Sequence, residues 1–323
     1  MDTAAWYRWF AEIEARVSSP QYERLANAVA ESNELLERLS LLPETKRQPN
    51  LLFASVRFLG GPTDAVEGFV EFIRSNSDEL EATMRTRSTQ TNEVARCAAF
   101  LPLLADLKGE IALIEVGASA GLCLFPDLYA YSYDGEQIGD SALEIAVETA
   151  HTVPPPQRLP TVAWRAGLDL NPLSVSDDED LAWLRACIWP EHNERRQRLD
   201  LAATIVATDP PRIDQGDLRS ATLNLIDEAP RDATKVVFHS AVLAYVDEPS
   251  RLDFATTMRS LVNSRSDVVW LSNEGPSVIA GIEAADPIAE PPGHAQFHLG
   301  RDGTELIAVT DPHGGWLRWM PPR

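Results

Sequence analysis

The chain has 323 residues, of which 44% are hydrophobic and 24% charged, as in ordinary globular proteins. Its 49 acidic and 28 basic side chains give a formal net charge of −21. Because this charge repels phosphate groups, and no apolar stretch approaches the ~20 residues that cross a bilayer, we expect neither nucleic acid nor a membrane as a partner.

Helical spacing of apolar residues dominates the first third of the chain. Pro62 is placed to begin a helix, and a capping signal at Thr91 or Asn92 begins another that ends at Gly109. The predicted helices span residues 20–42, 48–59, 62–75 and 91–107. We therefore predict a helical N-terminal region over residues 1–110.

From Ile111 the rhythm changes to short apolar strands separated by helical stretches, which is typical of a parallel α/β sheet covered on both faces. Strands are predicted at 111–116, 162–169, 211–215, 235–240 and 267–273, before an antiparallel hairpin that turns at Asp302-Gly303. A turn-rich stretch at about 129–160 predicts an inserted hairpin or lid instead of a simple crossover. The sequence thus predicts a Rossmann-like domain over 111–323.

A glycine-rich turn follows the first predicted strand, in the segment LIEVGASAGL at 113–122. The apolar run ends in Glu115, the turn begins at Gly117, and Gly121 is expected to open a helix. Glycines in such a turn let the backbone approach a ligand, and the amides at a helix start are unpaired donors. We therefore expect a nucleotide-like ligand at this position of the sheet.

Other known motifs compete for this turn. A dinucleotide fingerprint needs glycines where Ser119 and Leu122 stand, and a phosphate loop needs a Gly-Lys pair that is absent here. The stretch GASAG does match G-x-S-x-G, the nucleophile elbow of serine hydrolases. In that alternative Ser119 is the nucleophile, and its partners are Asp247 and either His294 or His298.

The same segment resembles the Glu-x-Gly-x-x-x-Gly turn of class I S-adenosylmethionine methyltransferases, and the order of elements resembles that family from about residue 111 to 320. The resemblance implies a methyltransferase-type sheet and S-adenosylmethionine as the cofactor. It places the methionine part at Glu115, Gly117, Ala118 and Gly121, the ribose at Asp169, and the adenine at Asp217 and Leu218. A carboxylate suits the ribose because it accepts from both hydroxyl donors.

Later strand ends supply candidates for methyl transfer. His239 is the candidate general base because imidazole titrates near neutrality, and the alternative is a core histidine bonded to its neighbours. Further candidates for the methionine end or the acceptor are Asn92, Arg96, Trp189, Ser240, Asn273 and Glu274. The Asn-Pro-Pro-Tyr motif of amino-directed nucleic-acid methyltransferases is missing after the fourth strand, so the predicted acceptor is a small molecule or a protein side chain.

The cysteines and histidines carry little further signal. Cys97, Cys123 and Cys187 lack C-x-x-C spacing, which predicts a reduced cytoplasmic protein without disulfides. The six histidines show no paired spacing, so no metal site is predicted.

Over almost its whole length the chain also resembles the family called domain of unknown function 2332. The matching stretches are NLLFASVRFLGG (50–61), TQTNEVARC (89–97), the glycine turn, WRAGLDLNPL (164–173), IWPEHNERRQRLD (188–200), VVFHSAVLAYV (236–246) and WLSNEGP (270–276). That resemblance implies no particular reaction. Three hypotheses therefore stay open: a methyltransferase, a serine hydrolase, and a non-catalytic ligand-binding or partner-binding module on the same fold.

Overall fold

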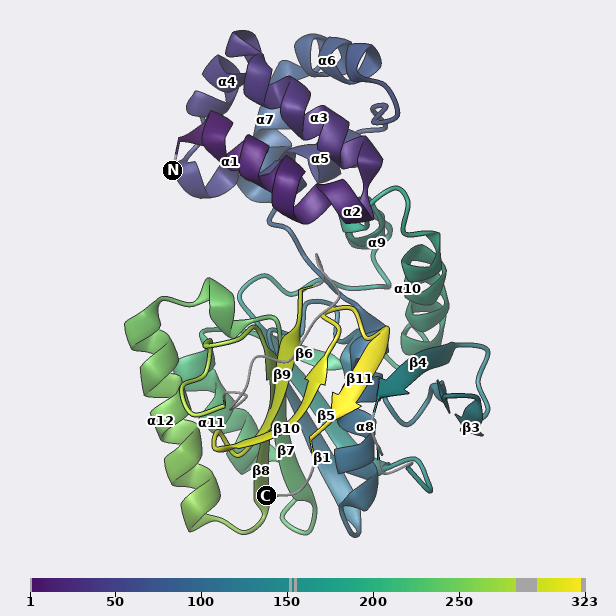
Figure 1. Ribbon diagram of the computed structural model, residues 1–323. Helices are drawn as coiled ribbons and strands as arrows, with labels where there is room; N and C mark the ends of the chain where they lie inside the picture. The colour runs from purple at the N-terminus through teal and green to yellow at the C-terminus, as the bar shows by residue number, and fades with distance from the viewer. Residues whose placement is uncertain (1, 151–152, 154–155, 283–294, 321–323) are drawn as a thin grey trace. The chain divides into compact units, whose positions relative to one another are not determined.

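The chain forms two compact units in a computed structural model (Figure 1). The structure describes residues 2–150, 153, 156–282 and 295–320. Unit 1 comprises Met1–Thr91 with Asp177–Gln197, and unit 2 comprises Asn92–Ser176 with Arg198–Arg323. The division therefore falls after Thr91, earlier in the chain than the predicted boundary at residue 110.

Unit 1 is helical. Its elements are α1 (Thr3–Trp9), the π-helix η1 (Phe10–Ala15), α2 (Arg16–Ser18), α3 (Pro20–Glu31), α4 (Asn33–Ser40), the 3₁₀ turn η2 (Glu44–Lys46), α5 (Pro49–Phe58), α6 (Val66–Ser75), α7 (Ser77–Thr86) and α9 (Asp178–Cys187). The helix predicted over 20–42 is two helices, because Ser32 is extended and its Oγ accepts the Leu35 amide at 3.3 Å, which begins α4.

Aromatic side chains build the core of unit 1. Tyr22 and Phe53 have ring centroids 4.6 Å apart, and Trp189 packs 5.6 Å from Phe10 and 5.5 Å from Tyr22. Trp189 also donates its indole N–H to Asn50 Oδ1 at 3.0 Å. This packing explains why the segment around Trp189 belongs to the helical unit although it lies far along the chain.

Unit 2 contains the sheet. Its strands are β1 (Glu110–Val116), β2 (Ala130–Tyr133), β3 (Glu136–Ile138), β4 (Glu144–Ala150), β5 (Thr161–Asp169), β6 (Arg212–Gln215), β7 (Thr234–Ser240), β8 (Val268–Glu274), β9 (Phe297–Arg301), β10 (Glu305–Thr310) and β11 (Trp316–Trp319). They form one sheet in the order β3-β2-β4-β11-β10-β9-β8-β7-β1-β5-β6. The predicted strands before the hairpin occur as β1, β5, β6, β7 and β8, with boundaries within one residue. An α/β fold is thereby confirmed.

The strands from β6 to β8 run parallel, and their chain order reverses between β1 and β7. Ile114 of β1 pairs with Ala166 of β5 on one side and with Val237 of β7 on the other. The predicted C-terminal hairpin is present as β9 and β10, which turn through Asp302 and Gly303. It continues into β11, so β8 to β11 form an antiparallel meander.

Helices cover both faces of this sheet. The helices α11 (Leu218–Glu228) and α12 (Glu248–Ser264) contact one face, where Val237 and Trp270 lie in a large apolar cluster with Phe254. Phe238 points to the opposite face because side chains alternate along a strand, and its ring lies 5.4 Å from that of Phe100 in α8 (Cys97–Asp106). Since α8 packs on the sheet in this way, it belongs to unit 2. The helix α10 (Asn193–Val206) crosses the boundary between the units.

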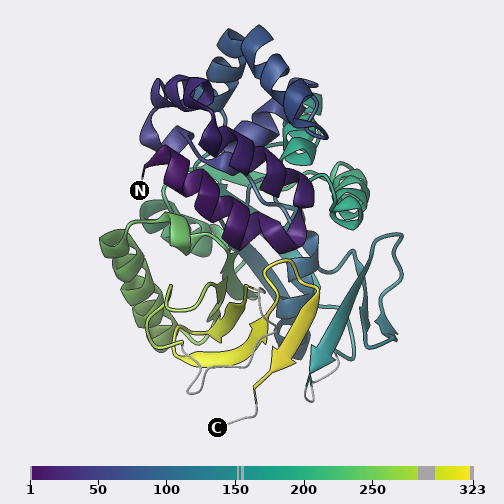
Figure 2. The ribbon, with the colours of Figure 1, turned by 45° about the horizontal axis from the view of Figure 1, so that its top comes forward.

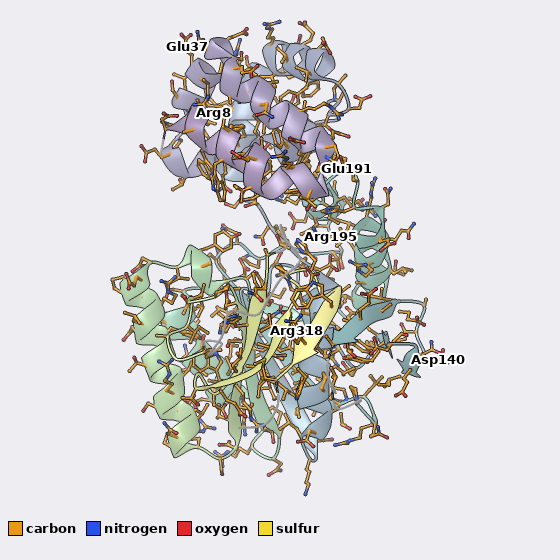
Figure 3. All side chains as sticks on the ribbon, viewed as in Figure 1. Arg8, Glu37, Asp140, Glu191, Arg195 and Arg318 are labelled. Carbon is orange, nitrogen blue, oxygen red and sulfur yellow. The ribbon has the colours of Figure 1, made fainter. Side chains whose placement is uncertain are left out.

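The stretch predicted as an insertion at 129–160 forms β2, β3 and β4. Strands β2 and β3 make a hairpin, Asp140 lies in the loop that follows it (Figure 3), and β4 pairs with β11, so these strands extend the main sheet (Figure 2). The prediction of a helix after Gly121 is wrong, since this segment forms only the 3₁₀ turn η4 (Leu122–Leu124). The reason is Pro126, whose ring nitrogen has no hydrogen to donate to the Leu122 carbonyl, and the Tyr129 hydroxyl donates there instead at 2.7 Å.

One close approach in unit 2 supports a testable prediction. Gly314 (φ 80°) lies so near the Ala95 backbone that an added Cβ would fall 2.5 Å from the Ala95 carbonyl carbon, whereas Gly135 (φ 91°) has open space. We expect Gly135→Ala to lower the free energy of unfolding by about 1 kcal/mol, the cost of a left-handed alanine. Gly314→Ala should lower it by at least ~2 kcal/mol more, because the backbone itself must move. Denaturant titration measures both, and equal losses would contradict the close approach.

Candidate functional site

The candidate site lies at the carboxyl ends of the parallel strands, where the glycine turn leaves β1. Asp169 ends β5 and Ser240 ends β7, next to β1 on either side, and Asn273 lies near the end of β8. Ligands of open α/β sheets bind at this edge, at the point where the strand order reverses. Here the strand order reverses between β1 and β7, and we call the place beyond the carboxyl ends of these two strands the crevice between β1 and β7.

The glycine turn adopts left-handed conformations at Gly117 (φ 73°), Ser119 (φ 54°) and Gly121 (φ 72°). Its amides bond within the protein. Gly117 and Ala118 both donate to the carbonyl of Leu168 in β5, at 2.7 and 3.0 Å, and Gly121 donates to Ala118 at 2.7 Å. The expectation that the amides of this turn are free donors is therefore wrong for these three, because the turn curls over the end of β5.

Asp169 fastens the turn to the neighbouring strand. Its Oδ2 accepts the Ser119 amide at 2.8 Å, and its Oδ1 accepts the Asn171 amide at 2.8 Å. A carboxylate offers about four acceptor positions, so capacity for further donors remains. Asp169 thus shapes the turn and is also placed to accept ligand hydroxyl groups.

Glu115 is a buried carboxyl group, only 8% exposed, and it lies one residue before the end of β1. Its Oε2 has no hydrogen-bond partner within the described part of the chain. Burial raises the pKa of Glu115 well above its ordinary value, nearby Cys123 and Asp169 raise this pKa further, and the Arg96 guanidinium opposes the rise. The group therefore favours a proton until a cation or donor arrives.

Two more buried polar atoms lack partners within the described ranges, one in this turn and one in the segment before α8. They are Ser119 Oγ and Asn92 Nδ2. Buried polar groups are nearly always hydrogen-bonded, so each such atom calls for an explanation. Together with Glu115 Oε2, these atoms are candidates within this unit for bonds to a ligand.

Arg96 ties the segment before α8 to the same edge of the sheet. It is buried, and it donates from Nε to the Pro312 carbonyl at 2.8 Å and from Nη1 to the Ser240 carbonyl at 3.2 Å. Its guanidinium also lies over the ring of Phe297, 5.8 Å from the centroid. The helix predicted from Thr91 begins later, because the 3₁₀ turn η3 (Val94–Arg96) precedes α8.

His239 is fully buried, and both of its ring nitrogens are bonded. Nε2 accepts the indole N–H of Trp270 at 3.0 Å, so Nδ1 carries the proton that it donates to Glu274 Oε1 at 2.7 Å. Glu274 also accepts the amides of Val242 and Leu243, at 3.0 and 3.2 Å. This arrangement fits the alternative of a core histidine, and the structure gives His239 no free nitrogen with which to act as a base.

Ser240 and Asn273 are bonded to each other. Asn273 donates from Nδ2 to Ser240 Oγ at 3.2 Å and accepts from the Thr310 hydroxyl at 2.8 Å. These bonds join β7, β8 and β10 at the carboxyl edge, so both residues rigidify the floor of the site.

Asp217 and Leu218 lie at the start of α11. Asp217 caps that helix by accepting the Arg219 amide at 2.9 Å, and the Arg219 side chain pairs with the carboxylate at 2.8 Å, which lowers the pKa of Asp217. Leu218 packs against the apolar cluster. Trp189, the remaining candidate, lies in the core of unit 1 and not in the unit that carries the other residues.

Sequence reasoning missed Val242. A Cβ added to Gly117 would fall 2.8 Å from Val242 Cγ1 and closer still to Cγ2, so the Val242 side chain rests directly on the glycine turn. The one feature of the sequence that could have pointed to this contact is the position of Val242 just after the end of a predicted strand. Valine is common in cores, and nothing in its local pattern marks this contact.

Within the described residues, Ser119 Oγ bonds neither Asp247 nor His298. Asp247 caps α12 by accepting the Ser250 amide at 3.1 Å, and His298 Nδ1 lies 3.1 Å from the Ile282 carbonyl. His294 lies outside the described residues. Within the described ranges, no cluster of histidine, cysteine and acidic side chains can hold a metal ion, and no helix is long and apolar enough to span a bilayer.

A family model described as "Uncharacterized protein conserved in bacteria (DUF2332)" matches residues 4–61 and 59–319. The chain therefore belongs to this family, as its sequence motifs indicated. No curated protein matches the chain.

The raised pKa of Glu115 predicts how stability depends on pH. The folded protein keeps a proton that the unfolded chain loses near the ordinary glutamate pKa, so this contribution to stability is full below that pKa and is lost as the pH rises through the folded-state value. Over the pH range above the ordinary glutamate pKa, the free energy of unfolding should fall more steeply with rising pH in the wild type than in Glu115→Gln. Denaturant titrations across this range test it. Glu110→Gln, at the exposed opposite end of β1, should keep the wild-type slope, and equal slopes for all three proteins would refute the assignment.

Proposed function

We propose that this protein binds S-adenosylmethionine at the crevice between β1 and β7 and transfers its methyl group to a small molecule or a protein side chain. The strand order supports this proposal. The run β6-β5-β1-β7-β8, written in chain order, is 3-2-1-4-5, as in doubly wound nucleotide-binding sheets, and antiparallel strands follow it. On that ground we assign the sheet to the Rossmann-like methyltransferase type.

The observation that carries the proposal is a set of buried atoms without partners among the described residues: Glu115 Oε2 and Ser119 Oγ at the glycine turn, and Asn92 Nδ2 in the segment before α8. Glu115 Oε2 needs a donor or a cation, and the α-ammonium group of the cofactor would supply both. Ser119 Oγ and Asn92 Nδ2 need acceptors, and the α-carboxylate of the cofactor would supply them. A ligand with an amino-acid end therefore fits the chemistry of these atoms.

The neighbouring residues fit the rest of the cofactor. The unused acceptor positions of Asp169 suit the ribose hydroxyls, and Asp217 and Leu218 lie one strand further along, where the adenine would bind. The bound cofactor would supply an electrophilic methyl group. The chain's own contribution is to orient the acceptor and to exclude water, since methyl transfer depends mainly on in-line positioning. The bonded pair Ser240 and Asn273 provides a fixed surface for that purpose.

Calorimetric titration with S-adenosylhomocysteine, the demethylated cofactor, tests this proposal. We expect the wild type to bind it, and Glu115→Gln and Asp169→Asn to weaken the affinity by about tenfold each, because each substitution removes a charge-assisted hydrogen bond. Glu110→Gln should bind as the wild type does. Absence of binding to the wild type at millimolar ligand would refute the proposal. Binding without turnover on any acceptor would favour the non-catalytic module.

A serine hydrolase is the second candidate, and one observation favours it. Ser119 has a strained left-handed backbone and a hydroxyl without a partner in the described part of the chain, as at a nucleophile elbow. The S-adenosylmethionine proposal predicts that a fluorophosphonate probe does not label Ser119, because no described imidazole contacts its hydroxyl. Mass spectrometry of the treated protein measures this. Labelling of the wild type that is absent in Ser119→Ala would instead establish the hydrolase.

A further inference from the structure

The crevice between β1 and β7 is bordered by two loops that touch each other. One is the glycine turn, and the other is the loop 241–246, which follows β7 and includes the 3₁₀ turn η5 (Leu243–Tyr245). The two loops meet where the side chain of Val242 packs against the Cα of Gly117. A Cβ on residue 117 would not fit there. The Val242 side chain therefore lies directly against the glycine turn, beside the point where the strand order reverses.

A buried relay of polar groups holds Val242 in place. Glu274 is 2% exposed and accepts the Val242 and Leu243 amides together with the His239 Nδ1 proton. Trp270 donates to the other nitrogen of His239 and so fixes the ring. One carboxylate thus fastens the two amides that set the position of the Val242 side chain.

The loop is also strained beside this contact. Ala241 has φ 58°, and left-handed backbone at a residue with a Cβ costs of order 1–2 kcal/mol. Ser119, on the opposite border of the crevice, has φ 54°. Strain of this kind persists only where the surroundings impose it, and it concentrates at switch regions and ligand clamps. Release of Ala241 to an ordinary conformation would offset part of the cost of moving Val242.

We propose that Val242 is a gate over the crevice and that Glu274 is its latch, so that a ligand reaches the glycine turn only after the loop 241–243 swings away. The gate rests on the proposed ligand site at this crevice and not on the identity of the ligand. Opening breaks the bonds of the Val242 and Leu243 amides to Glu274 and the bond of the Ala241 amide to the Asn273 carbonyl at 3.1 Å, and it leaves the bond between His239 and Glu274 intact. Glu274 is thus a positioning residue, which acts through the loop.

Hydrogen exchange of the full-length chain without ligand tests the gate directly. The Val242 and Leu243 amides should exchange through a local opening whose rate does not depend on dilute denaturant, whereas the amide of Ile114 in the central strand should exchange only through global unfolding. Glu274→Gln should accelerate exchange at Val242 and Leu243 by about tenfold to a hundredfold, since it weakens the bonds that a charge assists. Exchange of these two amides only with global unfolding would overturn the gate.

The matched control for the latch is Asp247→Asn. Asp247 is a carboxylate in the same connection that caps α12 and does not bond either amide of the gate, so its substitution should leave exchange at Val242 and Leu243 unchanged. Acceleration by Asp247→Asn equal to that by Glu274→Gln would mean general loosening of the loop and would overturn the role of Glu274 as a latch.

A second arm measures S-adenosylhomocysteine binding to the gate variants. Val242→Ala should bind about tenfold more tightly than the wild type because the open state is more populated, and Val242→Ile should bind more weakly. Equal affinity in the three proteins would overturn the gate and leave the cofactor proposal standing. Local exchange at Val242 without binding in any variant would keep the gate and refute the cofactor.

Discussion

The carbonyl of Leu168 is the group on which the candidate site depends, because it accepts the amides of both Gly117 and Ala118. The next residue, Asp169, accepts the Ser119 amide, so the end of β5 sets the path of the chain as it leaves β1. The left-handed conformations of the turn follow from that path. Since the protein uses these amides itself, a ligand at this edge must be recognised mainly by side chains. In this respect the turn differs from a helix N-terminus that offers free amides to an anion.

Three carboxyl groups at this edge have similar positions in the sequence, at the end of a strand or one residue before it, and different roles in the structure. Glu274 accepts three donors from its own chain and is a structural anchor. Asp169 accepts two amides and keeps acceptor capacity. Glu115 Oε2 accepts none from the described residues. Because desolvation of an unpaired carboxylate is costly, Glu115 is the group that gains most from a ligand, and it ranks first among the candidates.

The parallel strands could be predicted because buried strands are apolar over their whole length, and that pattern is local. Features that depend on contacts between residues far apart in the sequence could not be predicted. The bonds of His239 reach Trp270 and Glu274, 31 and 35 residues away, and no spacing in the sequence records them. The boundary of the units depends on the packing of Phe100 against Phe238. The missing helix after Gly121 did have a local signal in Pro126, which the glycine pattern outweighed.

The faces of the sheet separate ligand recognition from control of the loop. Glu115 pairs in register with Phe238, so both point to the face covered by α8, whereas His239 points to the opposite face, where it packs against Phe254 of α12. Glu115 and the relay that holds Val242 therefore lie on opposite faces of the sheet at its carboxyl edge. A substitution in the relay can change access to the crevice without touching the group that pairs with the ligand. The two functions are therefore open to independent adjustment.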